Sequence, residues 1–159
     1  MSETRELRYT VALRWTGNAG EGTATYHGYS RDHVVGGGDK PLIAGSTDPH
    51  FYGGDNARWN PEELLVASVS ACHQLWYLHL CAEAGVVVTS YEDNPEGVMV
   101  EQADGGGEFT RLILHPRVTI RTGGNVELAH DLHERAHALC FIARSLNFPV
   151  TYEAAIEAK

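Results

Sequence analysis

The alternation of apolar and polar residues near the N-terminus predicts a β-hairpin. Every second position of the first run is apolar, as in a strand with one apolar face: Leu7, Tyr9, Val11 and Leu13. A second run of strand type, residues 23–29, follows a turn-like segment at residues 17–20. Residues 36–60 are rich in Gly, Pro, Asp, Ser and Asn without periodicity, which predicts a long ordered loop.

A long apolar run predicts a central helix from Asn60 to Ala84. Asn60 is a suitable N-cap, Pro61 fits the first turn, and two glutamates follow where the positive end of a helix favours acidic side chains. Gly85 marks the end of the helix. The residues from Leu64 to Cys72 are apolar or small on every side, so we expect more than one face of this helix to be covered.

The remainder of the chain predicts an antiparallel meander, a second helix and a final strand. The predicted strands of the meander are residues 86–91, 97–101 and 109–121. An amphipathic pattern predicts a helix over residues 125–139, with a short turn continuing through Ser145. Residues 149–156 supply the last strand, so the element order indicates one α+β domain over residues 1–159.

Composition narrows the possible partners and the location of the protein. The 159 residues are of the size of one globular domain, and the net charge of −9 disfavours nucleic acid and anionic membranes as partners. The N-terminus is polar, and no apolar run approaches the length that crosses a bilayer. Three cysteines do not form a disulfide framework, so we expect a cytoplasmic protein whose cysteines are catalytic, metal-bound or buried.

Three motifs at fixed spacing carry a family resemblance. They read Asn60-Pro-Glu-Glu-Leu-Leu65, Ser70-Ala-Cys72 and His137-Ala-Leu-Cys140, the last preceding Arg144-Ser-Leu146. With the order of elements, which covers nearly the whole chain, they resemble the OsmC/Ohr family of osmotically inducible and organic hydroperoxide resistance proteins. The resemblance implies an α+β fold in which antiparallel sheets wrap around two central helices in an intertwined homodimer.

The resemblance also implies a two-cysteine thiol peroxidase that needs no cofactor or metal. Cys72 matches the peroxidatic cysteine and Cys140 the resolving cysteine, while Glu62 and Arg31 match the family's glutamate and early-loop arginine. A hydroperoxide would be the substrate, and a dithiol or a small thiol the reductant. Phe141 stands where many members have proline, and the loop before the helix is longer than in the organic hydroperoxide type, so the preferred peroxide and the reductant stay open.

These residue types suit peroxide chemistry. A thiolate is the nucleophile, and a free thiol with a pKa near 8.5 is mostly protonated at neutral pH, so a cation such as Arg31 would favour the anion. Glu62 could hold that guanidinium in a bidentate pair. A regular helix separates Glu62 from Cys72 by about 15 Å along its axis, so we expect either a kink or a contribution across a dimer interface.

Apolar residues around Cys72 would suit alkyl or lipid hydroperoxides. The candidates for lining such a pocket are Leu65, Val69, Leu75, Trp76, Phe51 and Phe141. A Cys72–Cys140 bridge would require Cα atoms within about 7 Å. His73 could tune the Cys72 thiolate, although adjacent helix residues point in different directions.

Several alternatives remain open. Cys81 has no counterpart in the family motifs, and we interpret it as structural. A metal site could use His133 and His137, with His73 or Asp32 as third ligand, whereas His130 and Cys140 lie too far apart along one helix to share one ion. The chain could also be a non-catalytic binder of a hydrophobic small molecule, or a redox sensor.

Overall fold

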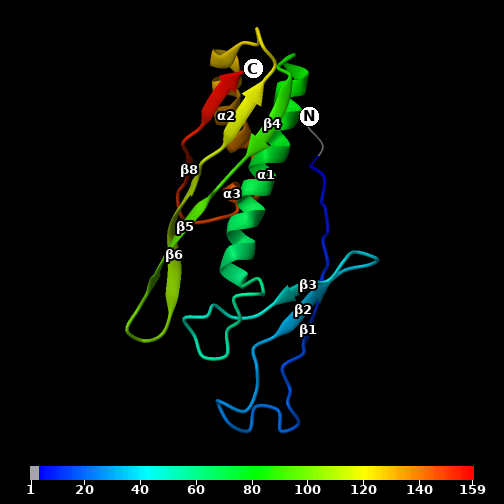
Figure 1. Cartoon of the computed structure of the whole chain (residues 1–159), viewed down its shortest axis with the longest axis vertical. Helices are drawn as coiled ribbons and strands as arrows, with labels where there is room; N and C mark the ends of the chain where they lie inside the picture. The colour runs from blue at the N-terminus through cyan, green and yellow to red at the C-terminus, as the bar shows by residue number, and fades with distance from the viewer. Residues whose placement is uncertain (1–3) are drawn as a thin grey trace. The chain divides into compact units, whose positions relative to one another are not determined.

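The chain contains both helices and strands, which confirms the α+β composition. It divides into two compact units. The computed structural model describes residues 4–159. Its two units are Met1–Leu64 and Leu65–Lys159. In Figure 1 the first unit runs from blue to cyan, and the second from green to red. That the whole chain is one domain stays a prediction.

The first unit is built on a three-stranded antiparallel sheet. Its strands are β1 (Ala12–Trp15), β2 (His33–Gly36) and β3 (Ile43–Gly45), in the order β1-β2-β3. The predicted pairing of the N-terminal strand with residues 23–29 is wrong, because β1 pairs with β2 and those residues form turns and bends. Tyr26 and Tyr29, which gave the segment its strand character, pack on the guanidinium of Arg31 instead.

The predicted loop at residues 36–60 contains β3 and then returns to it. The backbone N–H of Ser46 donates to the carbonyl of Trp59, and the N–H of Trp59 donates to the carbonyl of Ala44, each over 3.0 Å. Gly45 and Trp59 form an isolated parallel bridge. These bonds fix the chain immediately before Asn60, where the long helix begins.

Residues 4–64 of the first unit contribute to neither hydrophobic core of the chain. Within residues 4–64 the buried residues are Gly17, Gly45, Ser46 and Asn60, none of which has a large apolar side chain. The exposed fractions of Tyr9, Val11 and Leu13 are 84%, 76% and 66%. A segment of this size that buries so little apolar surface does not offset the entropy of ordering its chain. The unit therefore needs a further surface to cover it.

The central helix α1 (Pro61–Glu83) forms as predicted. Asn60 and Glu63 cap it reciprocally, because the Glu63 N–H donates to the Asn60 side chain over 2.8 Å and the Asn60 N–H donates to the Glu63 carboxylate over 3.1 Å. At the other end Gly85 has φ of +75°, and the Val86 N–H donates to the Cys81 carbonyl. This left-handed glycine closes the helix.

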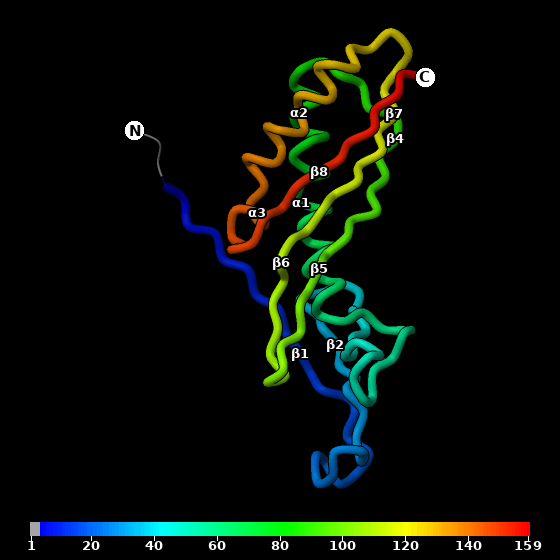
Figure 2. Tube along the Cα trace, turned by 90° about the vertical axis from the view of Figure 1, so that its left-hand side faces the viewer, coloured from blue at the N-terminus to red at the C-terminus, as the bar shows by residue number. Residues whose placement is uncertain are grey.

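The strands of the second unit form two three-stranded sheets. One contains β4 (Val88–Glu92), β7 (Arg117–Ile120) and β9 (Ala155–Ala158), in the order β4-β7-β9. The other contains β5 (Glu96–Glu101), β6 (Gly107–Leu114) and β8 (Val150–Tyr152), in the order β5-β6-β8. Figure 1 shows the β5–β6 hairpin as a long ribbon, and Figure 2 shows β4 beside β7.

The prediction of a simple antiparallel meander is wrong. The predicted strand at residues 109–121 breaks at His115 and Pro116, where proline lacks the N–H that a continuous ladder needs, and its halves β6 and β7 join different sheets. The predicted last strand is also divided in two, into β8 and β9, at Glu153 and Ala154. These two strands pair parallel with β6 and β7, so both sheets are mixed.

The second helix and the short turn after it lie where the sequence predicts them. Helix α2 (Val126–Leu139) begins after Asn125, whose side chain accepts the Leu128 N–H over 2.9 Å. Helix α3 (Phe141–Arg144) follows directly. One core joins α1, α2 and the β4-β7-β9 sheet through Tyr77, Leu80, Val118, Ile120 and Leu132. A second core joins α1 to β6 and β8 through Val69, Leu112, Leu114 and Val150.

Helix α1 is more apolar than the sequence prediction allowed. It is long and apolar enough to cross a membrane by length and composition, with 28% of its most apolar window buried. Its five buried residues form one stripe: Val69, His73, Tyr77, Leu80 and Cys81. The single chain therefore covers one face of α1, not the several faces expected.

A buried pair of histidines lies between α1 and α2. The Nε2 atom of His73 and the Nδ1 atom of His133 are 2.9 Å apart, and the side chains are fully buried. The His133 ring stacks on Tyr77 with 3.8 Å between ring centroids. Burial lowers the pKa of His73 to about 4 and of His133 to about 3, with a smaller lowering from His137 and His73 respectively. Both rings are therefore neutral at pH 7.

This pair predicts a loss of stability in acid. In the folded state the pKa values of His73 and His133 lie below the value of 6.5 for an unfolded histidine. Their contribution to the free energy of unfolding is therefore complete above pH 6.5 and is lost as the pH falls toward 4. We expect the free energy of unfolding to fall by on the order of 5 kcal/mol over that range because of the two histidines together. Urea unfolding of the double variant His73→Gln, His133→Gln should show a smaller fall, since glutamines keep a hydrogen bond without titrating.

The matched control replaces the half-buried His115 and the exposed His130 with glutamine. This control should keep the acid sensitivity of the wild-type protein. An equal pH dependence in wild type and in the His73, His133 variant would show that the buried pair does not cause the loss.

Candidate active site

Two of the three cysteines meet at the junction of three helices. Cys72 lies in the middle of α1, and Cys140 lies between α2 and α3 as the C-cap of the one and the N-cap of the other. Their side chains are in hydrogen-bond contact, and both are free thiols. The packing of α1 against the α2–α3 junction therefore brings together sulfur atoms that are 68 residues apart in the chain.

The two cysteines differ in their access to solvent. Cys140 has an exposed fraction of 1%, whereas Cys72 is half-buried. Burial raises the pKa of Cys140 to about 11, the N–H groups of Ala143 and Ile142 oppose this rise, and the hydrogen bond with Cys72 adds to it. Cys140 is thus a protonated thiol at neutral pH.

A small apolar pocket opens beside Cys72. Its volume is about 300 Å³, and it is lined by Cys72, Leu75, Trp76, His79 and Phe141. Trp76 and Phe141 meet edge to face with 5.6 Å between ring centroids. Of the other residues expected around Cys72, Val69 lies in the core with β6 and β8, and Phe51 belongs to the first unit. The pocket accepts an apolar group next to the sulfur.

Arg31 is held within its own loop in the first unit. Its guanidinium donates to the carbonyls of Tyr29 and Tyr26 over 2.8 and 2.9 Å, and lies 4.1 Å from the centre of the Tyr29 ring. The rings of Tyr26 and Tyr52 are 4.6 and 5.3 Å away, and Gly53, at φ of +79°, leaves room for the Arg31 side chain. Two of its five N–H donors are used by these carbonyls, so others remain for a ligand.

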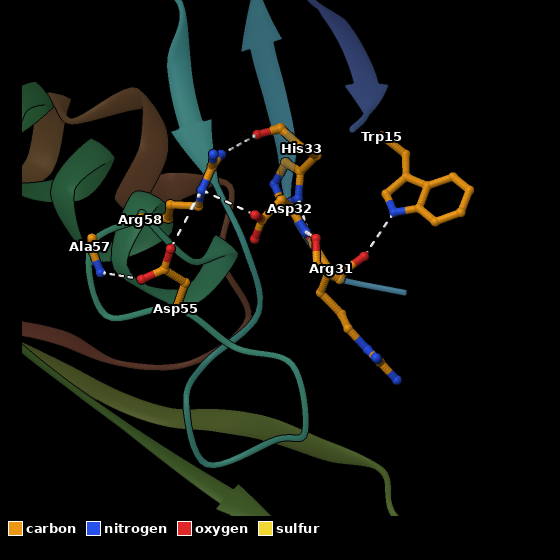
Figure 3. A network of polar contacts seen from close by, with 8 residues as sticks. Trp15, Arg31, Asp32, His33, Asp55, Ala57 and Arg58 are labelled. Atoms are coloured by element: carbon orange, nitrogen blue, oxygen red, sulfur yellow. Dashed lines mark hydrogen bonds and ion pairs between the residues drawn. The ribbon is translucent and has the colours of Figure 1, made fainter. Parts of the chain in front are cut away.

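A second arginine organises the same region, and the sequence motifs did not single it out. Nε of Arg58 lies 3.4 Å from Asp32 and 3.6 Å from Asp55, and its guanidinium donates to the carbonyl of His33 over 3.4 Å. Figure 3 shows Arg58 between the two carboxylates, with the Arg31 side chain pointing away from them. Arg58 thus ties residues 55–58 to the start of β2. Asp32 and His33 lie about 25 residues before Arg58 in the chain, so this arrangement gave no local signal.

The two glutamates at the start of α1 have different roles. Glu63 caps the helix, whereas Glu62 has no hydrogen-bond or ion-pair partner among residues 4–159. The Glu62 carboxylate is therefore not used by the fold.

Comparison with known proteins agrees with this arrangement. The family model described as OsmC-like protein matches residues 53–154, which include α1, both mixed sheets up to Tyr152 and the two cysteines in contact. The chain belongs to the OsmC-like family. The resemblance drawn from the motifs is confirmed.

Relatives of the OsmC-like family extend this match over nearly the whole chain. A solved OsmC-like protein of unknown function from Vibrio cholerae is 28% identical, with a TM-score of 0.84 over 94% of this chain and 100% of that one. An organic hydroperoxide resistance protein from Elizabethkingia anophelis is 18% identical, with a TM-score of 0.68 over 98% of this chain and 100% of that one. The OsmC/Ohr fold is therefore confirmed.

A curated relative has no assigned role. The uncharacterised protein YmaD of Bacillus subtilis (strain 168) is 24% identical over 121 residues, which cover 73% of this chain and 80% of that protein. The chain therefore shares its fold with proteins that include an organic hydroperoxide resistance protein.

The histidines of this OsmC-like chain do not gather into a metal site. In the part of the chain that the structure describes, no three His, Cys, Asp or Glu side chains are placed to share an ion. His73 turns away from the side of α1 that carries Cys72 and pairs with His133, as noted above. Cys81 lies in the core beside Tyr77, and burial raises its pKa. This position fits the structural role expected for Cys81.

The environments of the cysteines predict different reactivities. We expect iodoacetamide at pH 8 to alkylate Cys72 at least about ten times faster than Cys81 or Cys140, because the buried thiols are inaccessible and protonated. Mass spectrometry of peptides from the native protein gives the three rates. Cys140 modified as fast as Cys72 would contradict the burial described here, and alkylation in urea provides the control in which all three react alike.

Proposed function

We propose that this OsmC-like protein is a thiol peroxidase in which Cys72 reduces a hydroperoxide and Cys140 resolves the oxidised sulfur. The observation that carries the proposal is the contact between a half-buried thiol that opens on a pocket and a fully buried thiol that does not. In the first step the Cys72 thiolate attacks the terminal oxygen of the peroxide. The O–O bond breaks, Cys72 becomes a sulfenic acid, and the departing alkoxide takes up a proton and leaves as an alcohol.

The second step uses the contact between the two sulfur atoms. The Cys140 thiol condenses with the Cys72 sulfenic acid, which forms a disulfide and releases water. A resolving thiol already in contact favours this reaction over oxidation of Cys72 to the irreversible sulfinic acid. Cys140 is shielded from peroxide by burial, so it meets an oxidised sulfur only at Cys72.

The pocket favours organic peroxides over hydrogen peroxide. Leu75, Trp76 and Phe141 provide apolar surface for an alkyl or aryl group next to Cys72. Burial of such a group contributes about 25 cal/mol per Å² of apolar surface, which hydrogen peroxide cannot gain. The same pocket would admit a dithiol or a small thiol to reduce the disulfide. Free cysteines that cycle between the thiol and the disulfide suit a cytoplasmic location.

We further propose that the active protein is a homodimer. The first unit buries no large apolar side chain among its described residues, and Leu75 on α1 has an exposed fraction of 65%. A second copy would cover both surfaces with apolar surface of its own. Closed twofold dimers are the commonest way in which soluble chains satisfy such a need.

In this dimer Arg31 and Glu62 would act on the Cys72 of the partner copy. Helix α1 is unbroken from Pro61 to Glu83, and a regular helix separates Glu62 from Cys72 by about 15 Å along its axis. The free carboxylate of Glu62 and the spare N–H donors of Arg31 are suited to orient a peroxide and to favour a thiolate. Because the helix has no kink, we favour the alternative in which Glu62 acts across the dimer interface.

The thiol count after oxidation tests the reaction. After one equivalent of cumene hydroperoxide, the wild-type protein should lose two thiols and consume this peroxide faster than hydrogen peroxide. Cys72→Ser should be inert, because no nucleophile remains. Cys140→Ser should stop at a sulfenic acid that dimedone traps, since no resolving thiol is present.

Cys81→Ser is the matched control, with the same change at the third cysteine. It should still lose two thiols. Consumption of peroxide by Cys72→Ser at the wild-type rate would exclude the peroxidase and favour a binding or sensing role.

Mixed dimers test the contribution across the interface. Glu62→Gln alone should lower kcat/KM by about a hundredfold, because a misplaced guanidinium no longer orients the peroxide. A dimer of one Cys72→Ser chain and one Glu62→Gln chain, purified with two different tags, should regain about half of the wild-type activity, since one of its two sites then has both groups. No recovery would show that both groups act within one chain.

A further inference from the structure

His79 is the one side chain besides Cys72 in the pocket lining that can carry a proton. The pocket is otherwise lined by Leu75, Trp76 and Phe141. The His79 side chain has an exposed fraction of 57%, and its ring meets Trp76 edge to face with 5.8 Å between centroids. The fold does not use His79 in a core.

The contacts of His79 leave one ring nitrogen for the pocket. Its Nε2 atom lies 3.5 Å from Oε1 of Glu83, one turn further along α1. Its Nδ1 atom has no hydrogen-bond partner among the residues that the structure describes. Glu83 thus orients the ring through one nitrogen, and the other is available to a bound molecule.

The positions of Cys72 and His79 on α1 suit a molecule held between them. They are seven residues apart, which places them on the same side of the helix with an axial separation of about 10.5 Å. Both side chains line the same pocket, so a molecule bound there contacts the sulfur and the imidazole together.

We propose that His79 is the proton donor for the alkoxide that leaves when Cys72 attacks an organic hydroperoxide. This inference rests on the proposed peroxidase function. The Cys72 thiolate gives two electrons to the terminal peroxide oxygen, the O–O bond breaks, and the alkoxide takes a proton from the His79 ring to leave as an alcohol. The products are Cys72 sulfenic acid, an alcohol and a His79 ring that has lost one proton, which it regains from water.

The leaving group of the peroxide decides whether this proton matters. Cumene hydroperoxide releases a strongly basic alkoxide, so loss of the acid should slow its reaction. Perbenzoic acid releases benzoate, a stable carboxylate that needs no proton. A general acid typically contributes a factor of about 10² to 10⁴ to a rate. His79→Gln keeps a hydrogen-bonding side chain of similar size but cannot transfer a proton.

The experiment measures oxidation of Cys72 by both peroxides in wild type, His79→Gln and the control His130→Gln, which changes an exposed histidine of α2 outside the pocket. We expect His79→Gln to react about a hundredfold more slowly with cumene hydroperoxide and at the wild-type rate with perbenzoic acid. The alkylation rate of Cys72 by iodoacetamide should be unchanged, which shows that the nucleophile is intact. His130→Gln should match wild type in every assay.

Two results would overturn the role of His79 and leave the peroxidase standing. In the first, His79→Gln is slowed equally with both peroxides, which indicates an effect on the pocket and not on proton transfer. In the second, neither reaction is slowed. A wild-type protein whose Cys72 reacts with neither peroxide would instead refute the proposed function, and His79 with it.

Discussion

The burial of one stripe of α1 is the interaction on which the second unit depends. Val69 packs against β6 and β8, while Tyr77 and Leu80 pack against α2 and the β4-β7-β9 sheet, so one helix joins both cores. The same packing turns the next side of α1 toward the α2–α3 junction. Cys72 and Cys140 meet because the helix is fixed in rotation by apolar residues that take no part in chemistry.

Local signals in the sequence were strong where helices begin and end. Asn60, Glu63 and Gly85 are capping residues whose effect is confined to one turn, so α1 was predictable to within a residue or two. Helix α2 was predicted from its amphipathic pattern, and the structure shows that Asn125 caps it. The strand partners were not predictable, because the parallel pairing of β8 with β6 and of β9 with β7 depends on residues that are about 40 apart in the chain.

The candidate site was likewise predictable only where local motifs indicated its residues. The motifs indicated Cys72 and Cys140, and their environments follow from the packing of three helices, which no single segment encodes. The tyrosines around Arg31 were first interpreted as strand residues, since alternation alone does not distinguish a strand from a loop that packs on a cation. Arg58 and His79 were missed for a related reason. Their roles depend on neighbours, two carboxylates in one case and a pocket in the other.

The break at Pro116 has a consequence for the order of folding. Each mixed sheet takes its third strand from the segment that follows α3, so neither can be completed until that segment is available. Until then, β6 and β7 have an unpaired edge, and such edges are sites of aggregation. A nascent chain released early from the ribosome would expose both edges, whereas a chain held by a chaperone would keep them protected until the last segment is available. Completion of the protein is thus coupled to protection from misassembly.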